Sequence, residues 1–180
     1  MSELTRPPLT FAFFPEVATF ELTSTDIADG VTLDPAQVAD SMGYSGQNRS
    51  PQLSWRGFPP ETKSFVVTVH DPDAPTGSGF WHWLMVNIPA TVSELATNAG
   101  SGESRDAPSG TLQVRNDAGI RGYIGAAPPP GDPAHRYVHV VHALDVERLD
   151  VDETSSAAVV GFNLRFHTIA RAQVVPVFGS

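Results

Sequence analysis

The sequence predicts a mostly β fold, namely an antiparallel β-sandwich with Greek-key connections and one or two short helices. The 180 residues contain 15 glycines and 16 prolines, which separate many short apolar runs and therefore indicate many turns. The alternation of strand and helix patterns that is typical of parallel sheets is not visible. The length, together with the lack of a linker-like stretch, favours one domain over residues 1–180.

The expected strands are short apolar runs bounded by glycine, proline or polar residues. In the run that begins at His82, alternation places His82 on the same face as Leu84, Val86 and Ile88. β-branched residues are frequent in these runs, as is typical of strands. The full set covers residues 18–22, 52–55, 65–70, 82–88, 112–115, 137–144 and 172–178.

One helix is expected over about residues 155–168. One of the two serines at its start can cap it. Val159, Phe162 (or Asn163) and Phe166 recur at helical spacing, and Ile169 continues the series. This spacing, together with the capping serine, predicts the helix.

The net charge of −9 disfavours binding to polyanions. Phosphate backbones and anionic membrane surfaces repel an acidic protein, so we expect neither nucleic-acid binding nor stable membrane insertion. No apolar stretch has the length of a signal peptide or of a membrane span, so we expect a cytoplasmic protein. The chain has no cysteine, which excludes disulfides, thiol nucleophiles and cysteine-bound metals.

Two carboxylates and two prolines follow directly on the third expected strand. Asp71 and Asp73 therefore lie at the rim of that strand. Pro72 and Pro75 hold the chain extended around them. His82 begins the next strand after a Thr-Gly-Ser-Gly turn. We therefore expect a rigid loop that presents carboxylates beside a histidine.

A second proline-rich segment ends in a similar way. The stretch APPPGDP at 127–133 has too few backbone donors for regular structure, and His135 and Tyr137 follow it at the start of a strand. These two side chains face the same way because they are two residues apart. If this strand lies near the one that begins at His82, the two histidines, the tyrosine and the two aspartates line one pocket.

Each of these features also has a purely structural interpretation. Asp-Pro and Pro-Gly pairs are common in turns, and a single histidine at a strand start is more often a packing residue than a ligand-binding one. We expect His139 and His142 to be structural. Trp81 and Trp83 are expected to belong to the core or to a pocket wall.

Other kinds of site are less well supported. The two histidines and an aspartate could hold a metal, but no metal-ligand spacing accompanies them. The sequence around Ser78 lacks the G-x-S-x-G pattern of a nucleophile. We therefore expect no metal, no cofactor and no catalytic residue.

Four separated motifs resemble one known family. In order they are SPQLSW at 50–55, DPDAP with GFWHW at 71–75 and 79–83, RNDAG at 115–119, and PPPG with HRY at 128–131 and 135–137. Together they resemble the phosphatidylethanolamine-binding protein family, also called Raf kinase inhibitor proteins, and are most similar to its bacterial YbhB/YbcL branch. The similarity extends from about residue 20 to residue 178.

The resemblance implies a single domain of two antiparallel sheets with a pocket for a small anion, such as phosphate, acetate or a phosphorylated head group. It also implies a cis peptide bond between Ala74 and Pro75. The sequence departs from the bacterial pattern at Ile124, Ala126 and Ala127, which predicts a more apolar rim. The implied lining is Asp71, Asp73, Pro75, His82, Ala127, Pro128, His135 and Tyr137, with Phe80 or Trp81 on the wall.

We therefore expect a binding protein that takes a phosphate or carboxylate group and modulates a partner such as a kinase or a protease. The aspartates are expected to keep both histidines charged as donors to the anion. The alternative is a hydrolase or another enzyme with His82 or His135 as general base. Lipid carriage is disfavoured because no long apolar run indicates an acyl tunnel. A homodimer is also expected, since members of the branch often pair and Phe11, Phe13 and Phe14 have the character of exposed aromatic residues.

Overall fold

The most apolar runs of the sequence form the central strands of the larger sheet. They are β4 (Ser64–Asp71), β5 (Phe80–Pro89) and β9 (Val138–Leu144), whose side chains are almost all buried. Runs rich in β-branched residues suit this position because both faces of the sheet are covered. The other strands are β1 (Ala18–Thr19), β2 (Glu21–Thr23), β3 (Leu53–Arg56), β6 (Glu94–Leu95), β7 (Leu112–Gln113), β8 (His135–Arg136), β10 (Thr168–Val174) and β11 (Val177–Phe178).

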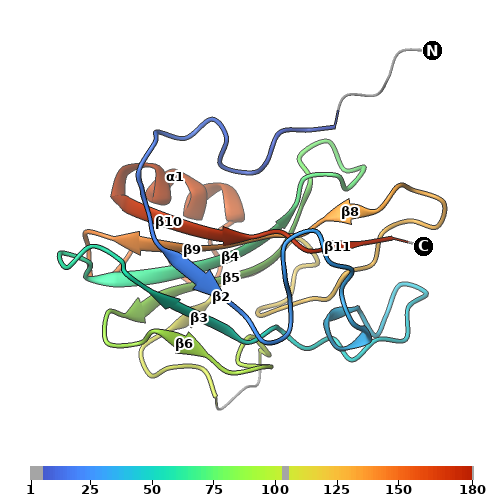
Figure 1. Cartoon of the computed structure of the whole chain (residues 1–180), viewed down its shortest axis with the longest axis horizontal. Helices are drawn as coiled ribbons and strands as arrows, with labels where there is room; N and C mark the ends of the chain where they lie inside the picture. Colours follow the sequence, from blue (N-terminus) through green and yellow to red (C-terminus); the bar gives the residue numbers. More distant parts are fainter. Residues whose placement is uncertain (1–5, 103–105, 180) are drawn as a thin grey trace.

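The computed structural model describes residues 6–102 and 106–179, and its strands form a β-sandwich with one α-helix (Figure 1). The larger sheet has the order β1-β10-β9-β4-β5-β7, and the smaller sheet has the order β2-β3-β6. β8 and β11 pair at one end. The central pairs are antiparallel, and only the short β1 runs parallel to its neighbour β10. Within this sheet β4, β5 and β7 are neighbours in the order of the chain. β9 comes later in the chain and returns beside β4, which is the Greek-key order. The predicted fold class is confirmed.

The main core lies between the two sheets. Trp55 of β3 packs edge to face on Phe65 of β4, with ring centroids 5.4 Å apart. Trp83 and Met85 of β5 are completely buried in the same cluster. A second cluster covers the outer face of the six-stranded sheet, where α1 (Ala157–His167) lies across it (Figure 1).

The helix buries a different apolar series from the one whose spacing predicts it. Val160 and Leu164 are buried against the sheet, whereas Phe162 and Phe166 are 67% and 64% exposed. Both sets recur at helical spacing, but the buried set begins with the small Ala157, which lets the helix approach the sheet closely. The expectation for the helix itself is confirmed, including its cap, because the side chain of Ser156 accepts from a backbone N–H of the first turn.

The contrast between the two faces of the helix gives a simple expected result. Leu164→Ala should lower the free energy of unfolding by about 2–4 kcal/mol, because it leaves a cavity under the helix. Phe166→Ala, on the exposed face, should change it by less than about 0.5 kcal/mol. Urea unfolding measures both, and a larger loss in Phe166→Ala than in Leu164→Ala would contradict the packing described.

Two irregularities in β5 set the directions of its side chains. The register with β4 shifts between Phe65 and Val67 and again between Val69 and His70, so β5 has extra residues opposite β4. After the first shift Ile88 belongs to the main core, whereas Leu84 packs on the outer face. The prediction that one face is shared is therefore confirmed for Leu84 and Val86, which both pack on the outer face, and wrong for Ile88 and His82. The second shift lies at His82, which leaves the outer face and turns toward the main core.

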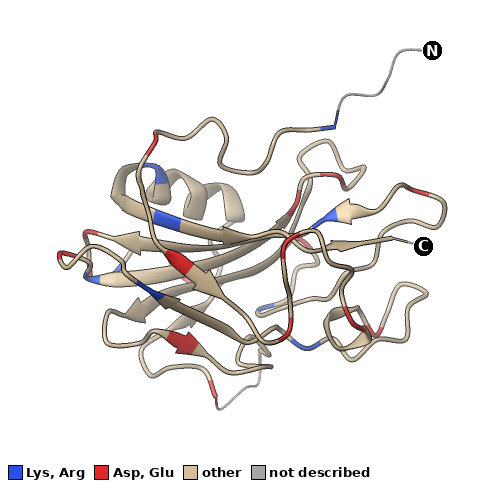
Figure 2. Cartoon of the chain, in the orientation of Figure 1, with Lys and Arg blue, Asp and Glu red and all other residues tan. Residues whose placement is uncertain are grey.

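The acidic residues are dispersed over loops and strand edges of both sheets rather than gathered on one element (Figure 2). They account for the net charge of −9, which opposes contact with polyanions. Within the described residues, no helix has the length and apolar character that a membrane span requires.

Candidate functional site

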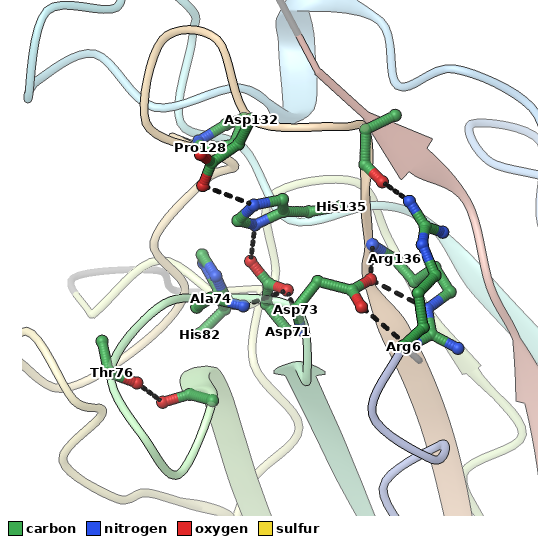
Figure 3. A network of polar contacts seen from close by, with 12 residues as sticks. Arg6, Asp71, Asp73, Ala74, Thr76, His82, Pro128, Asp132, His135 and Arg136 are labelled. Atoms are coloured by element: carbon green, nitrogen blue, oxygen red, sulfur yellow. Dashed lines mark hydrogen bonds and ion pairs between the residues drawn. The ribbon is translucent and has the colours of Figure 1, made fainter. Parts of the chain in front are cut away.

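The loop after β4 is built around the side chain of Asp71. Its Oδ1 accepts hydrogen bonds from the backbone N–H groups of Asp73 (2.9 Å) and Ala74 (3.1 Å), so the carboxylate closes the turn. Further along, the hydroxyl of Thr76 donates to the carbonyl of Gly79. Hydrogen bonds as well as prolines therefore fix this loop (Figure 3).

The peptide bond between Ala74 and Pro75 is trans, so the expectation of a cis bond is wrong. The two hydrogen bonds to Asp71 already turn the chain at this point. Left-handed φ angles at Gly77 (81°) and Gly79 (71°) complete the reversal, and glycine adopts them without strain.

His135 begins β8 with both ring nitrogens beside carboxylates. Nδ1 is 2.6 Å from Oδ2 of Asp71, and Nε2 is 3.3 Å from Oδ2 of Asp132 (Figure 3). The side chains of His135 and Asp71 are 3% and 4% exposed, whereas that of Asp132 is 37% exposed. Burial raises the pKa of Asp71, and the hydrogen bond from His135 works against this effect. The structure thus brings the two sequence motifs together through Asp71 and His135.

His82 is buried close by, but it is held by backbone. Its Nδ1 donates to the carbonyl of Ile124 (2.9 Å), and its ring lies against those of Phe80 and Tyr137. Burial lowers the pKa of His82 to about 4, so its ring is neutral near pH 7. With the proton on Nδ1, Nε2 is an acceptor. The expectation that the aspartates keep both histidines charged is therefore wrong for His82.

Asp73 binds Arg136 rather than a histidine. Its two carboxylate oxygens accept from Nε (2.8 Å) and Nη2 (2.7 Å) of the guanidinium, and Oδ2 also accepts from the backbone N–H of Arg136. Burial tends to raise the pKa of Asp73, but the hydrogen bonds from Arg136 outweigh it and lower the pKa. This bidentate pair fastens the loop after β4 to β8 and does not face the cavity described next.

A cavity of about 170 Å³ lies between the two motifs. Most of the predicted lining residues border it, whereas Asp73, Trp81 and Tyr137 do not. Met42 reaches it from a distant loop that no sequence signal marked. Ala127, where the sequence departs from the bacterial pattern, forms part of the mostly apolar wall. The complete lining is Met42, Asp71, Ala74, Pro75, Thr76, Phe80, His82, Ala127, Pro128, Pro129 and His135.

Two of the residues predicted to line the cavity, Tyr137 and Trp81, lie outside it. Tyr137 is 2% exposed and packs on the ring of His82, and its buried hydroxyl has no hydrogen-bond partner among the described residues. Its pKa is raised mainly by burial and also by the nearby Asp71, so the hydroxyl is a neutral donor. Trp81 points to the outer face of the sheet, where it stacks on His70 with ring centroids 4.3 Å apart.

The polar groups at the cavity are suited to hydrogen bonding with a small ligand. The rings of His82 and His135 supply nitrogens of different character, the first a neutral acceptor and the second placed between two carboxylates. Across residues 6–102 and 106–179, no group of three or more His, Cys, Asp or Glu side chains has the arrangement of a metal site.

A protein-family model described as "Phosphatidylethanolamine-binding protein" matches residues 23–179 of the chain. This range holds every residue of the cavity. The chain belongs to this family. The similar UPF0098 protein YbhB of Escherichia coli K12 is 53% identical over 158 residues, which cover 88% of this chain and 99% of YbhB.

Solved structures agree with this family assignment. The crystal structure of YbcL from E. coli is 48% identical and superposes with a TM-score of 0.88, covering 91% of this chain and 99% of YbcL. A carboxypeptidase Y inhibitor, solved in complex with its cognate proteinase, is 18% identical with a TM-score of 0.51, covering 91% of this chain and 84% of the inhibitor. At that identity it shows that the fold is shared.

The N-terminal arm (residues 6–16) of this phosphatidylethanolamine-binding protein family member precedes the matched range, yet it supports the site. The guanidinium of Arg6 donates to the backbone carbonyl that precedes His135 (2.6 Å). The hydroxyl of Thr10 lies 2.8 Å from Nδ1 of His70, which directly precedes the cavity aspartate. Neighbouring side chains of a strand point to opposite faces, so the arm holds the reverse side of the strands that border the cavity.

Most aromatic residues of the arm pack against other side chains of the same protein. Phe11 packs on His142 and Trp81, with ring centroids 4.6 Å and 6.3 Å away, and on Phe14. Of the three phenylalanines expected to be exposed, Phe13 is 84% exposed, while Phe11 and Phe14 cover the outer face of the sheet. A homodimer stays a prediction, with Phe13 as the remaining reason in the arm.

Proposed function

We propose that this protein binds a small anion, a phosphate or carboxylate group, in the cavity between His82 and His135, and that it modulates a partner protein such as a protease or a kinase. The main support for this proposal is the position of the His135 ring. Asp71 fixes Nδ1 of this buried ring, so Nε2 is the nitrogen left for a ligand. That nitrogen already attracts one carboxylate, which belongs to Asp132.

The size of the cavity supports a small ligand group. Its volume of about 170 Å³ lies below the range of about 300–1,000 Å³ that is usual for sites of drug-sized molecules. A phosphate or acetate group fits such a space, whereas a complete lipid does not. The mostly apolar walls lower the local dielectric constant and so strengthen the hydrogen bonds of the few polar groups.

The partner class is supported by relatives. A carboxypeptidase Y inhibitor has the same fold and was solved with its cognate proteinase, which makes a protease a reasonable class to test. The resemblance to Raf kinase inhibitor proteins supports a kinase in the same way.

An enzymatic function is the second candidate, because Asp71 and His135 form a carboxylate–imidazole pair of the kind that orients a general base. Among the residues that line the cavity, Thr76 carries a hydroxyl, which donates to the carbonyl of Gly79 instead of to this pair. Turnover of a panel of phosphoesters and carboxylic esters, abolished in His135→Gln, would favour the enzyme over the binding protein.

Calorimetric titration with sulfate tests the binding proposal, since sulfate keeps its charge across the range in which histidine titrates. We expect binding to be about tenfold weaker at about pH 8.5 than at about pH 5.5, which bracket the ordinary histidine range, because a charged ring donates more strongly to an anion. His82 has a pKa of about 4 and is neutral at both values, so His82→Gln should keep the pH dependence.

The matched variant His135→Gln should lose that dependence. Equal sulfate affinity of the wild type at both pH values would contradict the proposed role of His135. Parallel titrations with inorganic phosphate, acetate and phosphoethanolamine distinguish a free anion from a head group as the preferred ligand.

A further inference from the structure

The two carboxylates at His135 make unequal contacts. The Asp71 contact is short, at 2.6 Å, and both of its side chains are buried. The Asp132 contact is longer, at 3.3 Å, and the Asp132 side chain is 37% exposed. A long contact with a partly hydrated partner is weak, so Asp132 can leave His135 at little cost.

The protonation of the ring links both contacts. A histidine ring donates from both nitrogens only when it is charged. With Nδ1 directed at Asp71, the proton on Nε2 of the charged ring is directed at Asp132 (Figure 3). An anion in the cavity needs that same proton, because Asp71 already takes the other one.

The loop that carries Asp132 borders the cavity. Pro128 and Pro129 line it, and the backbone N–H of Asp132 donates to the carbonyl of Pro129 (3.2 Å). Gly131 has a φ of 90°, which places the turn directly before Asp132. The backbone of Asp132 is therefore fixed to the cavity wall, while its side chain is partly exposed to solvent.

We infer that Asp132 determines the affinity and selectivity of the site by competing with the ligand: its carboxylate holds Nε2 of His135 in the free protein, and an anion binds by displacing it. This inference rests on the proposed function. It accounts for a carboxylate at the edge of a site for anions, where a fixed negative charge would otherwise only repel the ligand. A phosphate-like dianion is then favoured over a singly charged carboxylate, because it replaces the Asp132 contact with a stronger one.

Sulfate calorimetry on Asp132→Asn tests the inference. The substitution keeps the shape of the side chain and removes its charge, so sulfate should bind about three- to tenfold more tightly than to the wild type at about pH 6, where many histidines are charged. A gain of affinity is a result that structural damage does not produce.

Asp145→Asn is the matched control. Asp145 also contacts a histidine, with Oδ1 2.9 Å from Nδ1 of His167, and it follows the end of β9 that lies away from His135. Asp145→Asn changes the net charge by the same amount as Asp132→Asn. The affinity of this variant for sulfate should stay within about twofold of the wild-type value, because an exposed distant charge is screened by salt.

The outcomes separate the two claims. Sulfate binding to the wild type with equal or weaker binding to Asp132→Asn would overturn the competition and leave the anion site standing. Tighter binding to both variants would also overturn it, since the effect would then come from net charge. No binding to any of the three proteins would overturn the proposed anion site and the competition together.

Discussion

Lowering the pH from about 7 to about 4 is expected to reduce the free energy of unfolding by several kcal/mol, because buried neutral histidines must take up protons. His82, His139 and His142 are buried, and burial lowers their pKa values to about 4, about 4 and about 3. In the unfolded chain these rings titrate near the ordinary value of about 6.5. The unfolded state therefore binds protons first, and stability is lost as the pH falls from about 6.5 toward about 4.

Asp71 acts in the opposite sense. Burial raises its pKa, so the folded state takes up this proton before the unfolded state does, and the carboxyl offsets part of the loss at the acidic end. Three histidines outnumber this one group, so the net direction is destabilisation by acid.

Urea unfolding across this pH range measures the effect. His142→Gln should reduce the slope of stability against pH by up to about 1.4 kcal/mol per pH unit, which is the contribution of one proton. His167→Gln is the control, because His167 is partly exposed and paired with Asp145. The same slope in His142→Gln and the wild type would show that this histidine does not contribute.

Asp71→Asn is expected to lower the free energy of unfolding by about 3 kcal/mol at neutral pH, because it removes one partner of a buried carboxylate–imidazole contact. The new amide would direct its N–H groups at Nδ1 of His135, which is a donor to Asp71 in the folded protein. Thermal or urea unfolding measures the loss.

Asp145→Asn provides the comparison for this substitution as well. It removes a carboxylate from a histidine pair whose side chains are 36% and 50% exposed, so we expect a loss of about 0–1 kcal/mol. Similar losses in Asp71→Asn and Asp145→Asn would contradict the view that burial gives the Asp71–His135 contact its weight.

The fold was predictable because its signals are local. Short β-branched runs bounded by glycine and proline became the central strands, and a serine-capped run became the helix. The helix face was not predictable in this way, since Ala157 and Val159 begin two apolar series and only the sheet beneath decides between them. The direction of Ile88 depends on a bulge, which is a property of strand pairing and leaves no clear trace in one strand.

For the candidate site, too, local motifs were predictable, whereas contacts between distant residues were not. The prolines and aspartates marked both loops, and the structure brings them together through Asp71 and His135. The partner of Asp73 was missed, because Arg136 lies more than 60 residues away and competes with the histidines for the carboxylate. The same holds for Met42, whose loop reaches the cavity only through the fold.

A crystal structure of the protein grown in concentrated phosphate tests the central claim most directly. We predict tetrahedral density in the cavity, within hydrogen-bond distance of Nε2 of His135 and beside His82, with the Asp132 carboxylate moved away from the ring. An empty cavity with Asp132 still 3.3 Å from His135, as in the free protein, would contradict the claim.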